Sequence, residues 1–204
     1  AWPSIELVLA YNNVALGGTI PTEVGTWAAI KSFFAFNCAL YGTLPTTVSS
    51  WTALSALLVY NNRLGGTLPS AIGAWTALQH IGIHHNKFEG VLPTAIAQWP
   101  ALDNMYAFGN RFSGPLPPLQ AGVGCRLTLN GAPFGNAFAC PPPAALSAQC
   151  TTRAPRDMRP CDATRTDIGA VVVPPDDTQP VTQPFASAGV STQAVRVDAQ
   201  AAGA

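Results

Sequence analysis

The sequence predicts a solenoid, a stack of short coils that all follow the same path, and three periodic features indicate it. Tryptophan returns at Trp27, Trp51, Trp75 and Trp99 with a period of 24 residues. Each tryptophan is followed by aliphatic residues. The last two of these stand two positions apart, which is the spacing of side chains on the inward side of a short strand. A glycine and a proline then close each unit. Such a repeat means that each unit buries its apolar side against the next.

The third unit shows the role expected of each column. Leu57 and Val59 point inward, and the chain then bends at Asn62, whose amide can bond backbone groups of the adjacent coil. Gly66 and Pro69 allow a second turn, because glycine reaches unusual φ and proline fixes its own. Cysteine takes the asparagine position in the second unit. The predicted structural columns are Trp27, Trp51, Trp75, Trp99, Asn62, Asn86, Asn110 and Cys38.

These columns follow the pattern L-x-x-L-x-L-x-x-N-x-L of leucine-rich repeats. The segment Leu64-Gly-Gly-Thr-Leu-Pro69 resembles the plant-type class of these repeats. The tryptophan column that follows Thr-Leu-Pro is similar to the leucine-rich surface antigens of kinetoplastid parasites, the promastigote surface antigen group, over residues 1 to about 161. We therefore expect an α/β-type leucine-rich repeat solenoid, right-handed, with short parallel strands and little regular helix.

The chain divides into three segments. Residues 1–118 hold five repeats of about 24 residues, with one residue inserted after Asn13 in the first. Residues 119–161 are expected to form a closing cap, in which Leu127 and Leu129 make a last, degenerate strand. Residues 162–204 are rich in Ala, Thr, Pro and Gln, and they contain too little apolar surface to offset the entropy of ordering. We expect a disordered stalk there.

The five cysteines separate into one and four. Cys38 belongs to the repeat and is expected to be buried, whereas Cys125, Cys140, Cys150 and Cys161 gather where the repeat fades. The spacings of these four match no zinc motif. Two disulfides that close the cap are the better interpretation, and they indicate an oxidising compartment. The three possible pairings stay open.

Several functional classes are excluded by composition and motif. Charged residues make up 10% of the chain and sum to zero, which argues against nucleic acid as a partner. The sequence carries no catalytic motif, so neither an enzyme nor a cofactor is expected. The histidines His80, His84 and His85 cluster, yet four residues of strand separate the first two by roughly 13 Å. We therefore expect no metal site.

The candidate binding surface lies between the inward columns of the strands, on the expected concave face. An exposed apolar stripe of this kind usually marks an interaction surface. The alternative is that the aromatic rings only stack and stabilise the sheet. The outward side chains form two columns, one running from Leu9 to Tyr106 and the other from Tyr11 to Phe108. Gly82 interrupts the first of them. The proposed protein-binding residues are Leu9, Tyr11, Phe34, Phe36, Leu58, Tyr60, His84, Tyr106 and Phe108.

These features indicate an extracellular or cell-surface module, expected to be monomeric, that recognises protein partners. Resemblance to the surface antigens implies host proteins as partners, and a stalk that leads to a GPI lipid anchor. The small residues near position 204 suit such an anchor site. A signal peptide is expected outside this sequence, and whether further N-terminal repeats and an anchor signal lie there stays open. Two alternatives remain: a plant-type receptor or enzyme-inhibitor ectodomain fragment, and a structural coat protein without a dedicated ligand.

Overall fold

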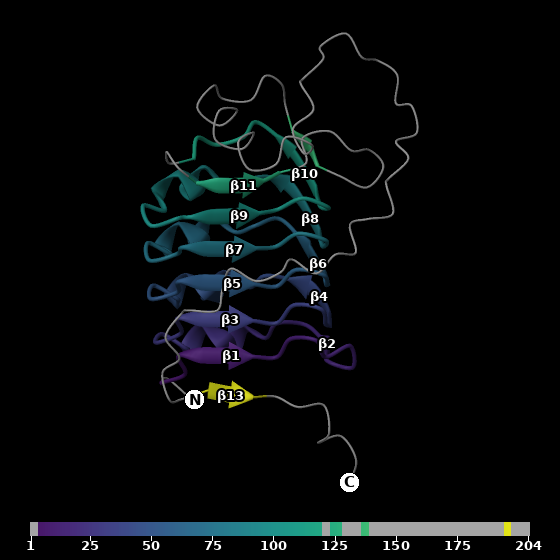
Figure 1. Ribbon diagram of the computed structural model, residues 1–204, viewed down its shortest axis with the longest axis vertical. Coiled ribbons are helices and arrows are strands. Elements are labelled where there is room, and N and C mark those ends of the chain that lie inside the picture. Colours follow the sequence, from purple (N-terminus) through teal and green to yellow (C-terminus); the bar gives the residue numbers. More distant parts are fainter. Residues whose placement is uncertain (1–3, 120–122, 128–135, 139–193, 197–204) are drawn as a thin grey trace.

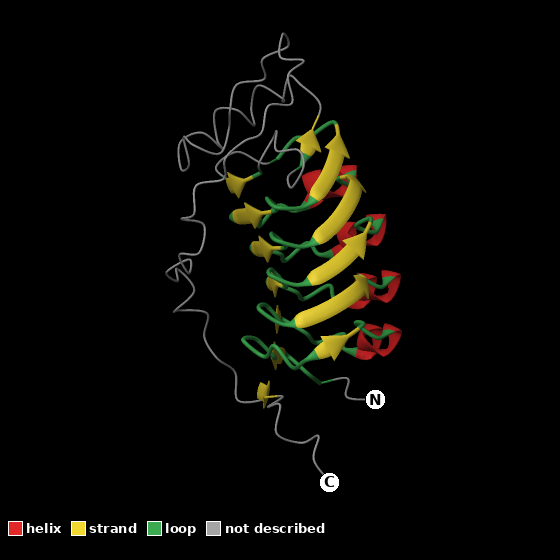
Figure 2. Ribbon diagram, turned by 90° about the vertical axis from the view of Figure 1, so that its right-hand side faces the viewer, coloured by secondary structure: helices red, strands yellow, loops and turns green. Residues whose placement is uncertain are grey.

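The computed structural model describes residues 4–119, 123–127, 136–138 and 194–196 of the 204-residue chain. They form a stack of coils with a parallel sheet on one side, a second parallel sheet beside it and a row of short 3-10 helices (Figures 1 and 2). The described part contains no helix long and apolar enough to cross a membrane. The predicted solenoid with short parallel strands and little regular helix is confirmed.

The first sheet contains one three-residue strand from each coil, stacked in chain order (Figure 1). Neighbouring strands pair in parallel with a register of one repeat, so that Phe33 lies beside Leu57 and Leu57 beside Ile81. This register keeps each inward column continuous through the stack. The strands are β1 (Leu7–Leu9), β3 (Ser32–Phe34), β5 (Ala56–Leu58), β7 (His80–Gly82), β9 (Asn104–Tyr106) and β11 (Gly124–Arg126).

The second sheet forms where the sequence pattern predicts only a turn. Each strand follows the residue of the bend, and in the first five coils a glycine of the strand adopts positive φ, as at Gly66 with φ +71°. The strands again pair in parallel, in the order of the coils. They are β2 (Gly17–Gly18), β4 (Ala39–Thr43), β6 (Arg63–Gly66), β8 (Lys87–Val91), β10 (Arg111–Gly114) and β12 (Ala137–Phe138).

Short 3-10 helices occupy the side of the coils opposite the first sheet (Figure 2). Each is preceded by the repeat's proline in an extended conformation, for example Pro69 with φ −68°. The fixed φ of proline suits the residue before a helix, and the helix then ends at the next tryptophan. The four helices are η1 (Thr22–Thr26), η2 (Thr46–Ser50), η3 (Ser70–Ala74) and η4 (Thr94–Gln98).

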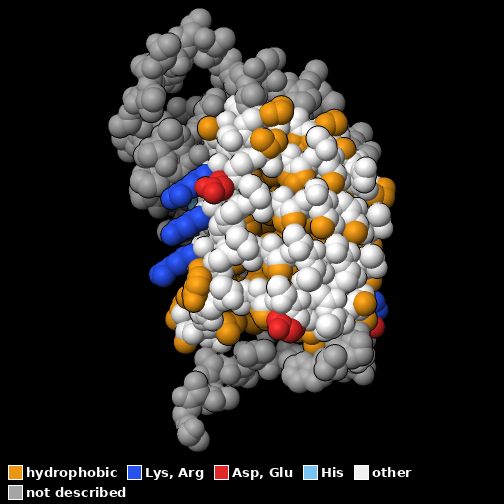
Figure 3. Space-filling model, turned by 180° about the vertical axis from the view of Figure 1, so that it is seen from behind, with side chains coloured by type: hydrophobic (Ala, Val, Ile, Leu, Met, Phe, Trp, Pro, Cys, Tyr) orange, Lys and Arg blue, Asp and Glu red, His pale blue; other side chains and the backbone are white. Residues whose placement is uncertain are grey.

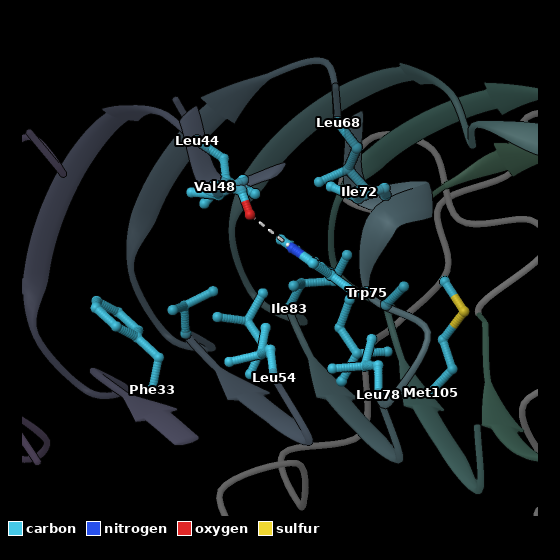
Figure 4. Close-up of a cluster of buried hydrophobic side chains, with 14 of the residues drawn as sticks. Phe33, Leu44, Val48, Leu54, Leu68, Ile72, Trp75, Leu78, Ile83 and Met105 are labelled. Carbon is cyan, nitrogen blue, oxygen red and sulfur yellow. Dashed lines mark hydrogen bonds between the residues drawn. The ribbon is translucent and has the colours of Figure 1, made fainter. Parts of the chain in front are cut away.

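The core lies between the first sheet and the 3-10 helices, and the tryptophans run through it. Trp51, Trp75 and Trp99 are fully buried, and neighbouring rings stack with centroids 6.3 and 6.1 Å apart. Each indole N–H donates to a carbonyl of the preceding coil, as from Trp75 Nε1 to Val48 O at 2.8 Å (Figure 4). Trp27 is only partly buried. Three of these four tryptophans thus lie wholly inside the stack.

The asparagine column joins neighbouring coils at the bend. Asn86 Nδ2 donates to Val59 O of the preceding coil at 2.9 Å and to Ile83 O of its own coil at 3.1 Å. Its Oδ1 accepts the backbone N–H of Leu64 at 3.0 Å. Asn62 and Asn110 repeat this arrangement. One side chain thus satisfies several backbone groups that the bend would otherwise leave without partners.

Both sheets continue past residue 118. Cys125 in β11 takes the inward position beside Met105, and Leu127 is buried one step further along. Asn136 repeats the bend, because its amide donates to Ala107 O at 2.9 Å and its Oδ1 accepts Phe112 N–H at 3.0 Å. The predicted degenerate strand therefore lies at 124–126, and Leu129 lies outside the described residues.

The predicted stalk falls almost entirely outside the described residues. Its one described segment, β13 (Ala194–Arg196), pairs in parallel with β1, with Ala194 beside Leu7 and Arg196 beside Leu9. The predicted cap cysteines Cys140, Cys150 and Cys161 also lie outside the described part of the chain. The division into repeats, cap and stalk thus remains a prediction.

Candidate protein-binding face

The outward surface of the first sheet carries a continuous stack of five aromatic rings. We call it the ring ladder: Tyr11, Phe36, Tyr60, His84 and Phe108. Successive centroids lie 4.8, 4.5, 4.4 and 4.6 Å apart, and the interplanar angles are 14° or less. Equivalent rings elsewhere, such as Phe88 and Phe112, are 6.2 Å apart. The ladder rings therefore stack more closely on one another than the core rings do.

The stacking changes what the ladder can offer to a partner. Ring faces inside the stack cover each other, so partners reach mainly the ring edges. Tyr11 at one end is 43% exposed, while Phe36, Tyr60 and Phe108 are partly buried. The rings therefore stabilise the sheet as the alternative interpretation predicts, and they also present a flat, uncharged strip.

Two predicted contact residues are buried, contrary to the expectation of an exposed stripe. His84 is 5% exposed because Tyr60 and Phe108 cover its faces and Tyr106 and His85 meet it edge-on. Leu58 is also 5% exposed.

The burial of Leu58 follows from the glycine in the next coil. Its Cδ2 lies 3.0 Å from the position that a Cβ on Gly82 would occupy. The leucine side chain therefore leans into the space above the glycine. Of the other predicted contact residues, Leu9, Phe34 and Tyr106 are partly buried beside the ladder.

A polar rim lies at the starts of the first-sheet strands. His80 Nδ1 is 3.3 Å from Asn104 Nδ2, which also donates to Asp103 Oδ2 at 2.7 Å. Burial lowers the pKa of His80, and the Asp103 carboxylate opposes this shift. At the other end of the rim Lys31 Nζ pairs with Glu6 Oε2 at 3.0 Å. The rim frames the uncharged ladder with groups that can hydrogen-bond a partner.

A second amide ladder, which the sequence pattern did not reveal, flanks the rings. Asn37 donates to Asn12 at 2.7 Å and Asn61 donates to Asn37 at 2.7 Å. These three residues and His85 have positive φ near 50°, a conformation that asparagine tolerates. The consecutive pair Asn61-Asn62 was the available signal. The first asparagine forms the exposed ladder, and the second forms the bend in the core.

Two cysteines are described. Cys38 has a free thiol that is only partly buried, contrary to the expected full burial, because the column is less covered near the first coil. Its Sγ donates to Ala10 O at 2.8 Å, and burial raises its pKa. Cys125 is disulfide-bonded, and its partner lies outside the described residues. Two disulfides in the cap remain a prediction.

Among the described residues, no three His, Cys, Asp or Glu side chains lie where they would hold a metal ion. Burial raises the pKa of Tyr60, so its phenol stays protonated at neutral pH. The chemistry available to a partner is therefore aromatic edges, amides and hydroxyls.

The comparisons with known proteins support the fold. No family model and no curated protein matches the chain. A plant peptide hormone receptor, RGFR1 in complex with RGF2, has 27% identity and a TM-score of 0.55 over 56% of this chain and 18% of the receptor. The Arabidopsis receptor kinase HAESA, in complex with the peptide hormone IDA and the co-receptor SERK1, has 26% identity and a TM-score of 0.52 over 60% of this chain and 20% of that one.

A further neighbour is similar over more of its own length. The BIR3–SERK2 complex from Arabidopsis thaliana has 25% identity and a TM-score of 0.54, covering 68% of this chain and 70% of that one. The chain spans about a fifth of the length of the first receptors that it matches. The fold is therefore a leucine-rich repeat solenoid, similar to the plant-type solenoids of receptor ectodomains.

Proposed function

We propose that this protein is an extracellular recognition module that binds a protein or peptide along the ring ladder. The observation that carries the proposal is the flat strip of stacked rings, uncharged along its length and bordered by polar groups on both sides. Aromatic side chains with a polar tip are common anchors in protein interfaces, because they bury much surface for little entropy.

The similar solenoids support this proposal, since RGFR1 is a plant peptide hormone receptor bound to RGF2 and HAESA is bound to the peptide hormone IDA. The resemblance of the tryptophan column to kinetoplastid surface antigens supports a place at the cell surface. It also favours host proteins as partners and a GPI anchor beyond the stalk. A receptor or inhibitor ectodomain of the plant type fits the fold equally well. A coat protein without a ligand would leave the strip unused.

Two exposed tyrosines provide a matched test. Tyr11 lies on the ladder and is 43% exposed, whereas Tyr41 lies in β4 of the second sheet and is 54% exposed. Peptides would be selected from a displayed random library on the intact protein, and their affinities measured by titration calorimetry. We expect Tyr11→Ser to weaken the selected peptides by about tenfold or more, as for an interface hot spot. Tyr41→Ser should leave them unchanged.

The combined variant Tyr11→Ser/Tyr106→Ser extends this test along the face. Both side chains are at least partly exposed, so the melting temperature should stay within a few degrees of the parent. Peptides that bind the combined variant as tightly as the parent would refute the ladder as the binding surface. Equal losses from Tyr11→Ser and Tyr41→Ser would also refute it, because the effect would then not be local.

A further inference from the structure

The basic side chains of three consecutive coils stand in a line at one edge of the second sheet. We call them the basic row: Arg63, Lys87 and Arg111, at the starts of β6, β8 and β10. All three are exposed. Figure 3 shows Lys and Arg side chains side by side along one edge of the molecule, with acidic side chains only at one end of the line.

The fold does not need positive charge in this column. Ala39 and Ala137 occupy the same position in the second and sixth coils, directly after the bend residue. Like charges in adjacent coils repel each other, so the row is unfavourable for the isolated protein. The stability of the fold therefore does not account for three cations in this column, whereas binding of an anionic ligand does.

The charge of the row is not neutralised by the described part of the chain. The ion pair found among the described residues joins Lys31 and Glu6, which lie away from the row. Glu89 is the acidic neighbour of the row, and the β8–β10 register sets it beside Arg111. No ion pair between them is formed in the described structure. The row thus keeps an excess of positive charge that an anionic partner can use.

The spacing of the row indicates the shape of that partner. Phe88 and Phe112 each follow a row residue directly, and their centroids are 6.2 Å apart. The register of the second sheet sets Lys87 beside Gly65 and Arg111 beside Glu89, so successive cations are diagonal neighbours about 7–8 Å apart. In an extended peptide, alternate side chains point to the same side about 6.6 Å apart. Acidic residues at alternate positions of an extended segment would therefore meet successive cations.

We propose that the basic row binds an extended acidic peptide segment, with Asp or Glu at alternate positions, that runs along the stack from coil to coil. This deepens the proposed function and rests on it, because the peptide would be part of the partner recognised at the ring ladder. The two surfaces adjoin: Tyr60 and Asn61 lie just before Arg63 in the chain. Carboxylates paired with arginine form charge-assisted hydrogen bonds, which are stronger than neutral ones.

The experiment compares two synthetic peptides of equal charge in titration calorimetry at low salt. One has glutamates at alternate positions, and the other has the same glutamates next to each other. We expect the alternate peptide to bind about tenfold more tightly, because one charge-assisted hydrogen bond corresponds to such a factor. The triple variant Arg63→Gln/Lys87→Gln/Arg111→Gln should lose this binding. Glu23→Gln, which removes a charge in η1 away from the row, should retain it.

Two further measurements sharpen the result. Glu89→Gln should strengthen the binding of the alternate peptide a few-fold, since it removes the acidic side chain that the described register places beside Arg111. Equal affinities for the two peptides would overturn the proposal, because attraction would then depend on charge alone. Tighter binding of a uronic-acid oligosaccharide with the same number of charges would overturn the peptide assignment. The triple variant keeps every ladder ring, so the failure of this proposal is separate from the failure of the ladder test.

Discussion

Asparagine serves two different purposes at neighbouring positions of this repeat. Asn62 and Asn86 face the core and bond backbone groups of two coils. Asn37 and Asn61, each one position earlier in the unit, face outward, adopt positive φ and donate their side-chain amides to the preceding asparagine of the same column. A buried polar side chain without partners is costly, whereas an exposed one can turn to water. The two columns should therefore differ greatly in their effect on stability.

Replacing Asn86 tests this difference. In Asn86→Ala the buried N–H of Leu64 loses its acceptor, and Val59 O and Ile83 O lose a donor. We expect the free energy of unfolding to fall by about 2–4 kcal/mol, since each unsatisfied buried group costs about 1–3 kcal/mol. Denaturant titration followed by circular dichroism measures this loss.

Asn61→Gly is the matched control. Glycine keeps the positive φ of this position, and Gly109 already occupies it in the fifth coil. Only an exposed amide bond to Asn37 is removed. The loss should stay below about 1 kcal/mol. Similar losses in the two variants would contradict the assignment of the second asparagine to the core.

At the scale of the elements, the second sheet depends on glycine. The repeat's glycine ends or interrupts each strand with positive φ, as at Gly42, Gly66 and Gly90. A Cβ on Gly66 would lie 2.8 Å from Cγ2 of Thr43, a residue of the preceding coil. Both the backbone conformation and the close approach of the coils therefore require glycine.

Gly66→Ala should lower the free energy of unfolding by about 2 kcal/mol, because the left-handed conformation alone costs an L-residue about 1–2 kcal/mol. Gly65→Ala is the control, since its Cβ would meet nothing closer than Lys87 O at 3.4 Å. The pair Gly66→Ala/Thr43→Ser removes the threonine methyl and should recover part of the loss. Thermal melts of the parent and the three variants measure these losses. Equal losses at the two glycines would contradict the requirement for glycine at position 66.

The sequence predicted the first sheet better than the second for a physical reason. Leu57 and Val59 alternate, and alternation is the period of a strand with one buried side. In the second sheet Leu64 is the one buried residue of β6 and two glycines follow it, so the alternation is too short to predict a strand. The stacking of the ring ladder and the burial of Leu58 also depend on side chains of other coils. Such contacts between coils cannot be inferred from the sequence pattern of a single repeat.

At the scale of the whole molecule, each coil among the described residues packs against the coils before and after it, and the first coil also pairs with β13. Stability then comes from the interfaces between neighbours, and an interior coil shares two of them. Trp75 stacks on Trp51 and on Trp99, and its indole bonds Val48. Trp27, in contrast, is partly buried and stacks on Phe33 at 6.5 Å. Trp2, in the column's first position, lies outside the described residues.

Trp75→Ala should therefore be among the most destabilising changes in the chain. It removes a fully buried ring from two interfaces, and such truncations cost about 3–5 kcal/mol. Trp27→Ala should cost about half as much, because its ring is less buried. Denaturant titration gives the two losses. Hydrogen exchange should show that Trp75→Ala loosens the coils on both sides of it, since both interfaces lose the ring. Equal losses at the two positions would mean that the tryptophans act independently of the stack.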